Sequence, residues 1–363
     1  MTGCEEIQDL LRPNIASLIP YSCARNDFKG VAEVYLDANE NWRDFVGSQG
    51  RNRYPDPLAT HVRESVERAL GLPAANLVIG NGSDEIIDLL MRIFCIPGKD
   101  SVMLLPPTYG AYRVFADIND AAVLTCPLTR GFQFDFPALE AALAMENENR
   151  TSRGGRCKLL FVCSPNNPTG NAFPIDQIER ICAMFDGITV VDEAYFDFSP
   201  YPSAATLLQR YPRLVVMRTL SKSWALANAR VGIAVACEAI VQTMVNTKYP
   251  YNLGGPSQEL AVRALEHASE VKEASRKIVE ARNALADKLR TLPAIKKVFP
   301  SDANFLLVKI ADPDCLCQWL RSQGIIIRNR SRELNCEGCV RITVGSDVEN
   351  RRLVEALEEY GRG

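Results

Sequence analysis

The chain has 363 residues, of which 47% are hydrophobic and 23% charged, and its formal net charge is −3. This composition is typical of a globular protein with a large core, and the absence of a basic tract argues against a nucleic-acid partner. No stretch reaches the roughly 18 apolar residues of a membrane span, and the acidic N-terminus lacks the apolar region of a signal peptide, so a cytoplasmic protein is expected.

Short apolar runs alternate with amphipathic helical patterns in the first two thirds of the chain. The expected strands are 76–80, 101–105, 121–126, 158–164, 188–192, 214–219 and 230–236. The expected helices between them include 84–94, 175–185 and 203–211. This alternation predicts an α/β fold with a large, mostly parallel sheet whose two faces are covered by helices.

The pattern changes after residue 258. A long helix is expected from about 257 to 290. Strands at 303–309, 324–328 and 339–344 and helices at 315–324 and 347–360 follow it. They predict a smaller α+β domain. The first 50 residues alternate too little to fold alone and are expected to pack against it, which divides the chain into a large domain, 50–255, and a small domain, 1–49 plus 256–363.

Two residue types limit the possible chemistry. The two histidines, His61 and His267, lie in helix-like segments, so neither a metal site nor a Ser-His-Asp triad is expected, and lysine becomes a candidate base. The twelve cysteines are scattered, as is typical of reduced cytosolic thiols. The single C-x-x-C, from Cys336 to Cys339, is interpreted as a turn through Gly338 rather than a zinc or redox site.

In open α/β sheets ligands bind beyond the carboxyl ends of the strands, so the residues that follow each strand matter most. The first strand leads into GNGSDE (80–85). Its glycines allow close approach of the backbone, and a helix starting at Gly82, Ser83 and Asp84 offers free N–H groups to an anion. Ser83 and Asp84 are the expected N-caps. Glu85 replaces the third glycine of the dinucleotide fingerprint, which is therefore excluded.

Two further strand ends carry polar side chains. CSPNNPTG (163–170) predicts a rigid turn that holds the amide of Asn167 at the end of its strand. Asp192 ends the apolar run ITVV, where a carboxylate is costly to bury without a positive partner. Tyr195 is expected to point to the same side as Asp192, and Glu193 to the opposite side.

The fourth strand end is RTLSKSWALANARVG (218–232), which brings Ser221, Lys222 and Arg230 to the same edge. A nucleophilic amine beside a buried acid suggests imine chemistry, and pyridoxal 5′-phosphate would use every part of this set. Lys222 would form a Schiff base with its aldehyde. The phosphate would lie at the start of the helix near residue 83, with Ser221 and Arg230.

The ring of the cofactor has its own predicted partners. Asp192 would keep the ring nitrogen protonated. Asn167 and Tyr195 would hydrogen-bond its 3-hydroxyl group, and Tyr109, in PPTYG, would stack on the ring.

The sequence closely resembles the histidinol-phosphate aminotransferases, a branch of the fold-type I pyridoxal-phosphate enzymes. The resemblance covers nearly the whole chain and rests on SPNNPTG (164–170), DEAY (192–195) and TLSK (219–222) in this order. PPTYGAY (106–112) and two arginine segments, GIIIRN (324–329) and VRITVG (340–345), narrow it to this branch.

The resemblance implies transamination between L-histidinol phosphate and 2-oxoglutarate, in histidine biosynthesis. It implies a homodimer in which Tyr54 reaches the cofactor phosphate of the neighbouring subunit. Arg341 would bind the α-carboxylate of glutamate. Arg328, helped by Tyr21, would bind the distal anion, which is the phosphate of histidinol phosphate or the γ-carboxylate of glutamate. Asn167 would also contact the substrate.

The sequence departs from the family pattern at one place, and three other functions remain possible. The family usually has a glycine two residues before the cofactor arginine, whereas this chain has Asn228-Ala229-Arg230, and Asn228 is expected to allow the turn. An aromatic-amino-acid aminotransferase and a phosphothreonine decarboxylase share the fold. A non-enzymatic regulator on an aminotransferase core would need a DNA-binding segment, for which the sequence offers no basic helix.

Overall fold

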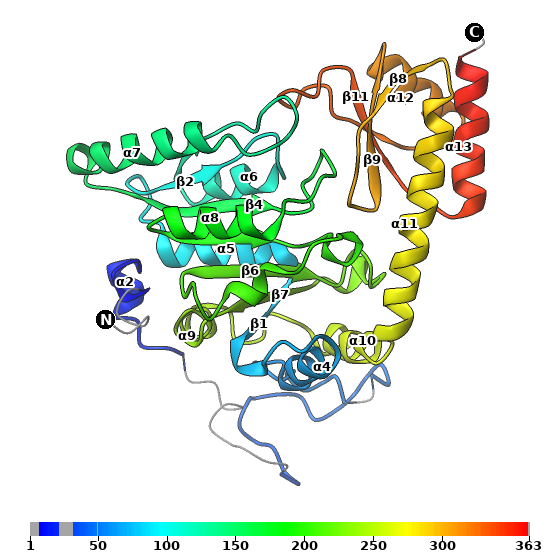
Figure 1. The fold of residues 1–363 in the computed structure, drawn as a ribbon. Coiled ribbons are helices and arrows are strands. Elements are labelled where there is room, and N and C mark those ends of the chain that lie inside the picture. Colours follow the sequence, from blue (N-terminus) through cyan, green and yellow to red (C-terminus); the bar gives the residue numbers. More distant parts are fainter. Residues whose placement is uncertain (1–6, 22–31, 49, 362–363) are drawn as a thin grey trace.

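Residues 7–21, 32–48 and 50–361 are described by the computed structural model, and they form two β-sheets flanked by helices (Figure 1). The large sheet has the strand order β1-β7-β6-β5-β4-β2-β3, and the small sheet has the order β10-β11-β9-β8. In the large sheet β7 is antiparallel to both its neighbours, and the other pairs are parallel. The predicted α/β fold with a mostly parallel large sheet is therefore confirmed.

The strands are β1 (Leu77–Asn81), β2 (Ser101–Leu104), β3 (Ala122–Thr125), β4 (Cys157–Cys163), β5 (Ile188–Asp192), β6 (Leu214–Thr219), β7 (Val231–Ala236), β8 (Ile295–Val298), β9 (Phe305–Ile310), β10 (Arg328–Asn329) and β11 (Cys339–Thr343). The α-helices are α2 (Pro13–Ala16), α4 (Thr60–Leu70), α5 (Gly82–Phe94), α6 (Ala111–Ile118), α7 (Phe136–Arg153), α8 (Ile175–Met184), α9 (Glu238–Thr247), α10 (Gly255–Leu265), α11 (Ala268–Arg290), α12 (Pro313–Ser322) and α13 (Asp347–Tyr360). The 3-10 turns are η1 (Ala74–Asn76), η2 (Phe196–Phe198), η3 (Ala204–Leu207) and η4 (Ala227–Ala229).

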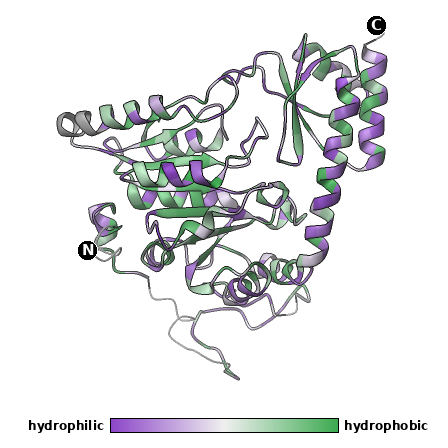
Figure 2. Ribbon diagram, in the orientation of Figure 1, coloured by the Kyte–Doolittle hydropathy of each residue, from purple (hydrophilic) through white to green (hydrophobic). Residues whose placement is uncertain are grey.

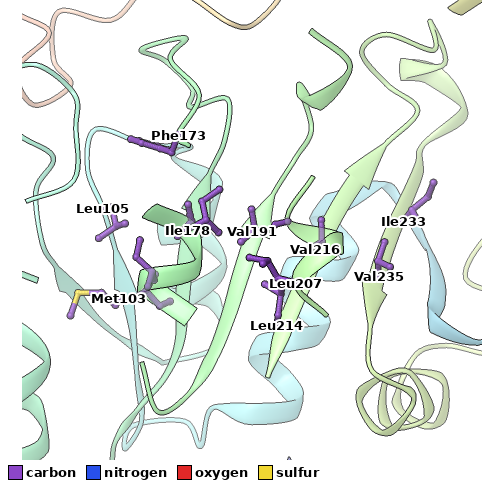
Figure 3. Packing of buried hydrophobic residues seen from close by; sticks show 14 of the residues in the cluster. Met103, Leu105, Phe173, Ile178, Val191, Leu207, Leu214, Val216, Ile233 and Val235 are labelled. Atoms are coloured by element: carbon purple, nitrogen blue, oxygen red, sulfur yellow. The ribbon is translucent and has the colours of Figure 1, made fainter. Parts of the chain in front are cut away.

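The central strands are continuous hydrophobic runs because both faces of the large sheet are buried. Val191 and Val216 face one core, which α4, α8 and α10 cover, and Figure 3 shows these side chains near the middle of the sheet. Val190 and Val215 face a second core, formed with α5, α6 and α9. Burial on both faces fixes the positions of the strand ends, where the polar residues lie.

The small sheet buries one face against α11, α12 and α13. Val340 and Ile342 of β11 belong to this core, whereas Cys339 belongs to the core of the large domain. Because side chains alternate along a strand, Arg341 lies on the same face as Cys339. In Figure 1 the small sheet stands beside α11, and Figure 2 shows hydrophilic and hydrophobic residues alternating along α11 and α13.

Three predicted elements are corrected by the structure. The expected helix 203–211 is reduced to η3, because the chain turns after Leu207, whose carbonyl oxygen accepts from the N–H groups of both Arg210 and Tyr211. The expected helix 257–290 is two helices, since α10 ends before His267, the N-cap of α11. Of the expected strand 324–328, only Arg328 belongs to a strand, the two-residue β10 on the edge of the small sheet.

The N-terminal segment 7–16 packs on the large domain. Leu10 is buried in the same core as α5, and the buried Lys158 donates a hydrogen bond from Nζ to the Leu10 carbonyl oxygen at 2.6 Å. The backbone N–H of Arg12 donates to the carbonyl oxygen of Ile93 at 3.1 Å. The expectation that this segment packs against the C-terminal unit is therefore wrong for residues 7–16. The predicted domain boundaries otherwise stay predictions.

Candidate active site

The strand topology brings five chain segments to one edge of the large sheet. β1, β4, β5 and β6 all end there, and the antiparallel β7 begins there. A cavity of about 230 Å³ opens at this edge. It is lined by Ser83, Asp84, Tyr109, Cys163, Asn167, Asp192, Ala194, Tyr195, Thr219, Ser221, Lys222, Arg230, Arg328, Arg330 and Arg341. Eleven of these fifteen were predicted as site residues from the sequence.

Lys222 lies in the loop that follows β6, and a backbone hydrogen bond joins this loop to β7. The N–H of Leu220 donates to the carbonyl oxygen of Val231 at 3.0 Å, which keeps this loop beside β7. The Lys222 amine lies 5.5 Å from the centre of the Tyr195 ring and forms no hydrogen bond with any residue that the structure describes. The cavity leaves the side chain accessible to solvent, but the protein around the amine lowers its pKa by desolvation, and the positive charge of Arg341 lowers it further.

Asp192 is buried at the end of β5, with 3% of its surface exposed. The hydroxyl of Tyr112 donates a hydrogen bond to Oδ2 at 2.6 Å, and the N–H of Ala194 donates to Oδ1 at 3.0 Å. Burial raises the pKa of Asp192, while these two donors and the nearby Lys222 oppose that shift by stabilising the carboxylate. The arrangement offers a buried acid that a positive group can pair with.

Tyr112 was not predicted. Its ring is fully buried and stacks on Phe161, with ring centres 4.7 Å apart, and it meets Tyr109 edge-on at 5.4 Å. Its position three residues after Tyr109 is a weak signal, because Tyr112 otherwise looks like an ordinary residue of α6.

Asn167 connects the two sheets at the cavity. Its Nδ2 donates to the hydroxyl of Tyr195 at 3.3 Å, and its Oδ1 accepts from Arg341 Nη1 at 2.6 Å. The turn that carries it is fixed by Asn166, which is buried and donates from Nδ2 to the carbonyl oxygen of Pro107 at 2.8 Å. Burial raises the pKa of Tyr195, so its hydroxyl stays protonated and can donate a hydrogen bond.

Tyr195 and Glu193 both follow β5, but their side chains point to different sides of the sheet edge. β5 ends at Asp192, and Tyr195 is already the N-cap of η2, so it reaches the cavity from a turn rather than from extended chain. Glu193 points away from the cavity, as expected, and its carboxylate pairs with Arg218 Nε at 3.1 Å. This buried ion pair holds the loop after β5.

The start of α5 forms the cradle expected for an anion. Asn81 is the N-cap and makes no side-chain cap hydrogen bond, so Ser83 and Asp84 lie in the first turn and are not N-caps, contrary to prediction. Gly82 has a φ of +76°, and an added Cβ there would collide with the guanidinium of Arg230. Arg230 Nη2 pairs with Asp84 Oδ2 at 3.1 Å, so a cation stands beside the helix start.

The turn before β7 differs from the expectation for Asn228. Asn228 lies inside η4, and the left-handed residue is Arg230 itself, with a φ of 53°. The side chain of Arg230 nevertheless reaches the cavity. Nearby, Ser221 donates its backbone N–H to Thr219 Oγ1 at 3.1 Å, which orients the loop between the two strands.

Three predicted site residues do not line the cavity. Gly82 lies behind it, against Arg230. Tyr54 is half exposed, stacks on Tyr251 with ring centres 4.4 Å apart, and lines a separate hollow with residues 50–55 and 254–256. Tyr21 is exposed and lines neither of these cavities.

The other groups considered for chemistry stay outside this cavity. Neither His61 nor His267 lines it. Cys336 and Cys339 are free thiols joined by the expected turn, in which the N–H of Cys339 donates to the Cys336 carbonyl oxygen at 2.9 Å. Within the described ranges, no group of three or more His, Cys, Asp or Glu side chains is placed to hold a metal ion.

The residues of the cavity fit pyridoxal 5′-phosphate. The uncapped helix start and Arg230 suit a phosphate, because backbone N–H groups and a guanidinium are its usual donors. The buried carboxylate of Asp192 suits a pyridine nitrogen that carries a proton, and the amine of Lys222 suits the aldehyde. Tyr109 lines the same cavity and offers an aromatic ring for stacking.

Comparisons with known proteins agree with this geometry. Residues 23–357 match the family model described as aminotransferase class I and II. The chain is 43% identical to the histidinol-phosphate aminotransferase of Cytophaga hutchinsonii over 354 residues, which cover 98% of this chain and 99% of that protein.

Two solved structures share the fold. One is the histidinol-phosphate aminotransferase of Sinorhizobium meliloti in complex with pyridoxal-5′-phosphate, with a TM-score of 0.76, 24% identity and coverage of 87% of this chain and 84% of that chain. The other is the L-threonine-O-3-phosphate decarboxylase of Porphyromonas gingivalis, with a TM-score of 0.69, 20% identity and coverage of 84% and 92%.

The fold and the cavity thus define an enzyme of the fold-type I class, and the chain belongs to the class I and II aminotransferase family. Within that family, its similarity over nearly the full length is to histidinol-phosphate aminotransferases. In the part of the chain that the structure describes, no helix combines the length and the apolar character needed to span a membrane.

Proposed function

We propose that this aminotransferase uses pyridoxal 5′-phosphate to exchange the amino group between L-histidinol phosphate and 2-oxoglutarate. The products are imidazole acetol phosphate and glutamate, which places the enzyme in histidine biosynthesis. The single observation that carries the proposal is the meeting of Lys222, Asp192 and a set of arginines around one cavity. The similarity to histidinol-phosphate aminotransferases over 98% of the chain supports it.

When bound, pyridoxal 5′-phosphate supplies an aldehyde carbon and a ring that accepts electrons. Lys222 would hold that aldehyde through its amine. Once free, the Lys222 amine would accept the proton from the substrate Cα and later return it. The lowered pKa of Lys222 suits this task, because the neutral amine is the form that accepts a proton.

The acid and the amide have separate roles. Asp192 keeps the ring nitrogen protonated, and Tyr112 holds the Asp192 carboxylate in place through the 2.6 Å hydrogen bond. Asn167 and Tyr195 would hydrogen-bond the 3-hydroxyl group, and Tyr109 would pack against the ring. The first turn of α5, with Gly82, Ser83 and Asp84, would hold the phosphate together with Ser221 and Arg230.

The substrates are held by arginines of the small sheet. Arg341 binds the α-carboxylate of glutamate, since its guanidinium is already oriented by Asn167. Arg328 binds the distal anion, which is a phosphate for one substrate and a carboxylate for the other. A guanidinium accommodates both anions, so one cavity serves two unlike substrates. Tyr21 would help to bind that anion.

We also propose a homodimer in which Tyr54 completes the site of the neighbouring subunit. The segment 32–48 exposes large apolar side chains such as Leu36, Phe45 and Val46, which are 77–91% exposed. Exposed apolar stretches of this kind mark interaction surfaces. Tyr54 is anchored next to this segment, because its N–H donates to Glu40 Oε1 at 2.7 Å. We place the enzyme in the cytoplasm, where its thiols stay reduced.

An amino-transfer assay tests the proposed function. Purified enzyme loaded with pyridoxal 5′-phosphate is given glutamate with imidazole acetol phosphate or, separately, with phenylpyruvate. We expect fast formation of 2-oxoglutarate with the phosphate substrate and slower formation with phenylpyruvate. A preference for phenylpyruvate would favour the aromatic aminotransferase. Release of CO₂ from O-phosphothreonine would favour the decarboxylase, which shares the fold.

A further inference from the structure

The hairpin of β10 and β11 presents three arginines to the cavity. Arg328 lies directly opposite Arg341 in the antiparallel register. Arg330 follows two residues after Arg328, and its backbone N–H donates to the carbonyl oxygen of Cys339 at 2.9 Å, so the pairing continues past β10. Because side chains alternate, all three guanidinium groups share one face, and all three line the cavity.

This cluster carries more positive charge than the protein around it balances. Five cationic side chains and two carboxylates line the cavity, and one of the carboxylates, Asp84, already pairs with Arg230. Burial lowers the pKa of Arg341, and the guanidinium groups of Arg330 and Arg328 lower it further. Like charges opposite each other across two strands are unfavourable unless an anion lies between them.

Arg330 has donor capacity left for a ligand. Its Nη1 lies 3.4 Å from Glu333 Oε1, a partly exposed ion pair. Its Nε is buried and has no hydrogen-bond partner. A buried donor without an acceptor costs free energy, which a bound anion in the cavity would recover. Arg328 forms no ion pair with the residues that the structure describes. Arg328 and Arg330 therefore both have N–H donors that a ligand in the cavity can use.

We propose that Arg330 is a specificity-determining residue that binds the phosphate of the substrate together with Arg328. The inference rests on the proposed function and deepens it, because it explains how the distal subsite prefers a phosphate monoester. A phosphate near neutral pH carries between one and two negative charges and has three acceptor oxygens, enough for two guanidinium groups. A carboxylate carries one charge and is satisfied by one guanidinium.

Calorimetric titration of the cofactor-loaded enzyme with propyl phosphate and with butyrate tests the proposal. These probes resemble the two distal anions and lack a reactive amine. In Arg330→Gln, the affinity for propyl phosphate should fall by about tenfold to a hundredfold, and the affinity for butyrate by less than about threefold. The KM for histidinol phosphate should rise accordingly, while that for glutamate should change little.

Two variants serve as controls. Arg332→Gln removes the same charge from an exposed position outside the cavity and should leave both affinities unchanged. Glu333→Gln removes the ion-pair partner of Arg330 and should bind propyl phosphate at least as tightly as the wild type. If Arg330→Gln loses the cofactor, Arg330→Lys is tested in its place. Its affinity for propyl phosphate should fall by about threefold to tenfold, because an ammonium group lacks the paired donors of a guanidinium.

The proposal would be overturned by equal losses for both probes in Arg330→Gln, or by unchanged binding of propyl phosphate. The proposal would also be overturned if Glu333→Gln lost as much affinity for propyl phosphate as Arg330→Gln. The ion pair, and not a contact of Arg330 with the ligand, would then explain the effect. These outcomes differ from a failure of the proposed function, which would appear as absent turnover of histidinol phosphate by the wild-type enzyme.

Discussion

At the scale of single residues, the reactivity of Lys222 depends on the charges around its amine. Burial and the positive charge of Arg341 lower its pKa below the ordinary value of 10.5. Removing Arg341 in Arg341→Gln should therefore raise this pKa, so a higher pH is needed to reach the neutral amine. Reductive methylation of the cofactor-free protein, followed by mass spectrometry of the Lys222 peptide, gives the pH of half-maximal reactivity, which should move upward.

Arg276→Gln is the matched control, because Arg276 lies on the exposed side of α11 and pairs only with acids of that helix among the described residues. Its pH profile should coincide with that of the wild type. A half-maximal pH that stays fixed or falls in Arg341→Gln would contradict the role given to Arg341.

The site residues found from sequence and those missed differ in one physical respect. Asp192 ends a hydrophobic strand, and Asn167 and Lys222 follow one closely, so the strand itself marks their position at the edge of the sheet. Tyr112 looks like an ordinary helix residue, and its partner Asp192 is 80 residues away in the sequence. Arg330 follows a strand of only two residues, which no hydrophobic run announces.

At the scale of elements, the close approach of β7 to the start of α5 shapes the anion cradle. A Cβ on Gly232 would overlap the backbone of Gly82 and lie 2.5 Å from the N atom of Ser83. In Gly232→Ala the strand and the helix must move apart. We expect the free energy of unfolding to fall by about 1–3 kcal/mol, and the affinity for pyridoxal 5′-phosphate to fall as well.

Chemical denaturation and cofactor titration measure these two quantities. Gly131→Ala is the control, since an added Cβ there has its nearest neighbour at 3.8 Å and should change neither quantity. Wild-type cofactor affinity in Gly232→Ala would show that the cradle does not need this contact.

The strands of the large sheet, which is buried on both faces, were predictable from the sequence. The segments that connect strands and helices were not. Strands such as β5 and β6 are hydrophobic on both faces, which marks them strongly in the sequence. The segment 203–211 has a helical pattern but forms only η3. Its N-cap residue, Ser203, donates a hydrogen bond to the carboxylate of Glu193, just after β5, which no local pattern reveals. The break at His267 has no glycine or proline to signal it, so α10 and α11 were predicted as one helix.

At the scale of the whole molecule, two segments within the first 50 residues make different contacts. Residues 7–16 pack on the large domain, whereas the segment 32–48 keeps its apolar side chains exposed. Sequence patterns report which residues are apolar but not which surface covers them, so the packing of residues 7–16 was predicted wrongly. The exposed segment leads directly to Tyr54, and we propose that a second subunit covers both.

Mixing two inactive or weakened variants tests whether Tyr54 serves the neighbouring site. Lys222→Ala should be inactive, and Tyr54→Ala should bind the cofactor weakly. If Tyr54 crosses, a mixed dimer contains one site with Lys222 from one chain and Tyr54 from the other. Random reassociation of equal amounts should then restore about a quarter of the wild-type specific activity, because half of the dimers are mixed and each has one intact site.

The control is a mixture of Lys222→Ala with a chain that carries both Lys222→Ala and Tyr54→Ala, which contains no intact lysine and should stay inactive. Cofactor absorbance and the size of the complex are measured on each mixture before the assay, so that failed reassociation is recognised. Suppose the first mixture reassociates into dimers and still shows only the averaged activity of its two components. Tyr54 would then act within its own subunit or not at all, and the shared site would have to be abandoned.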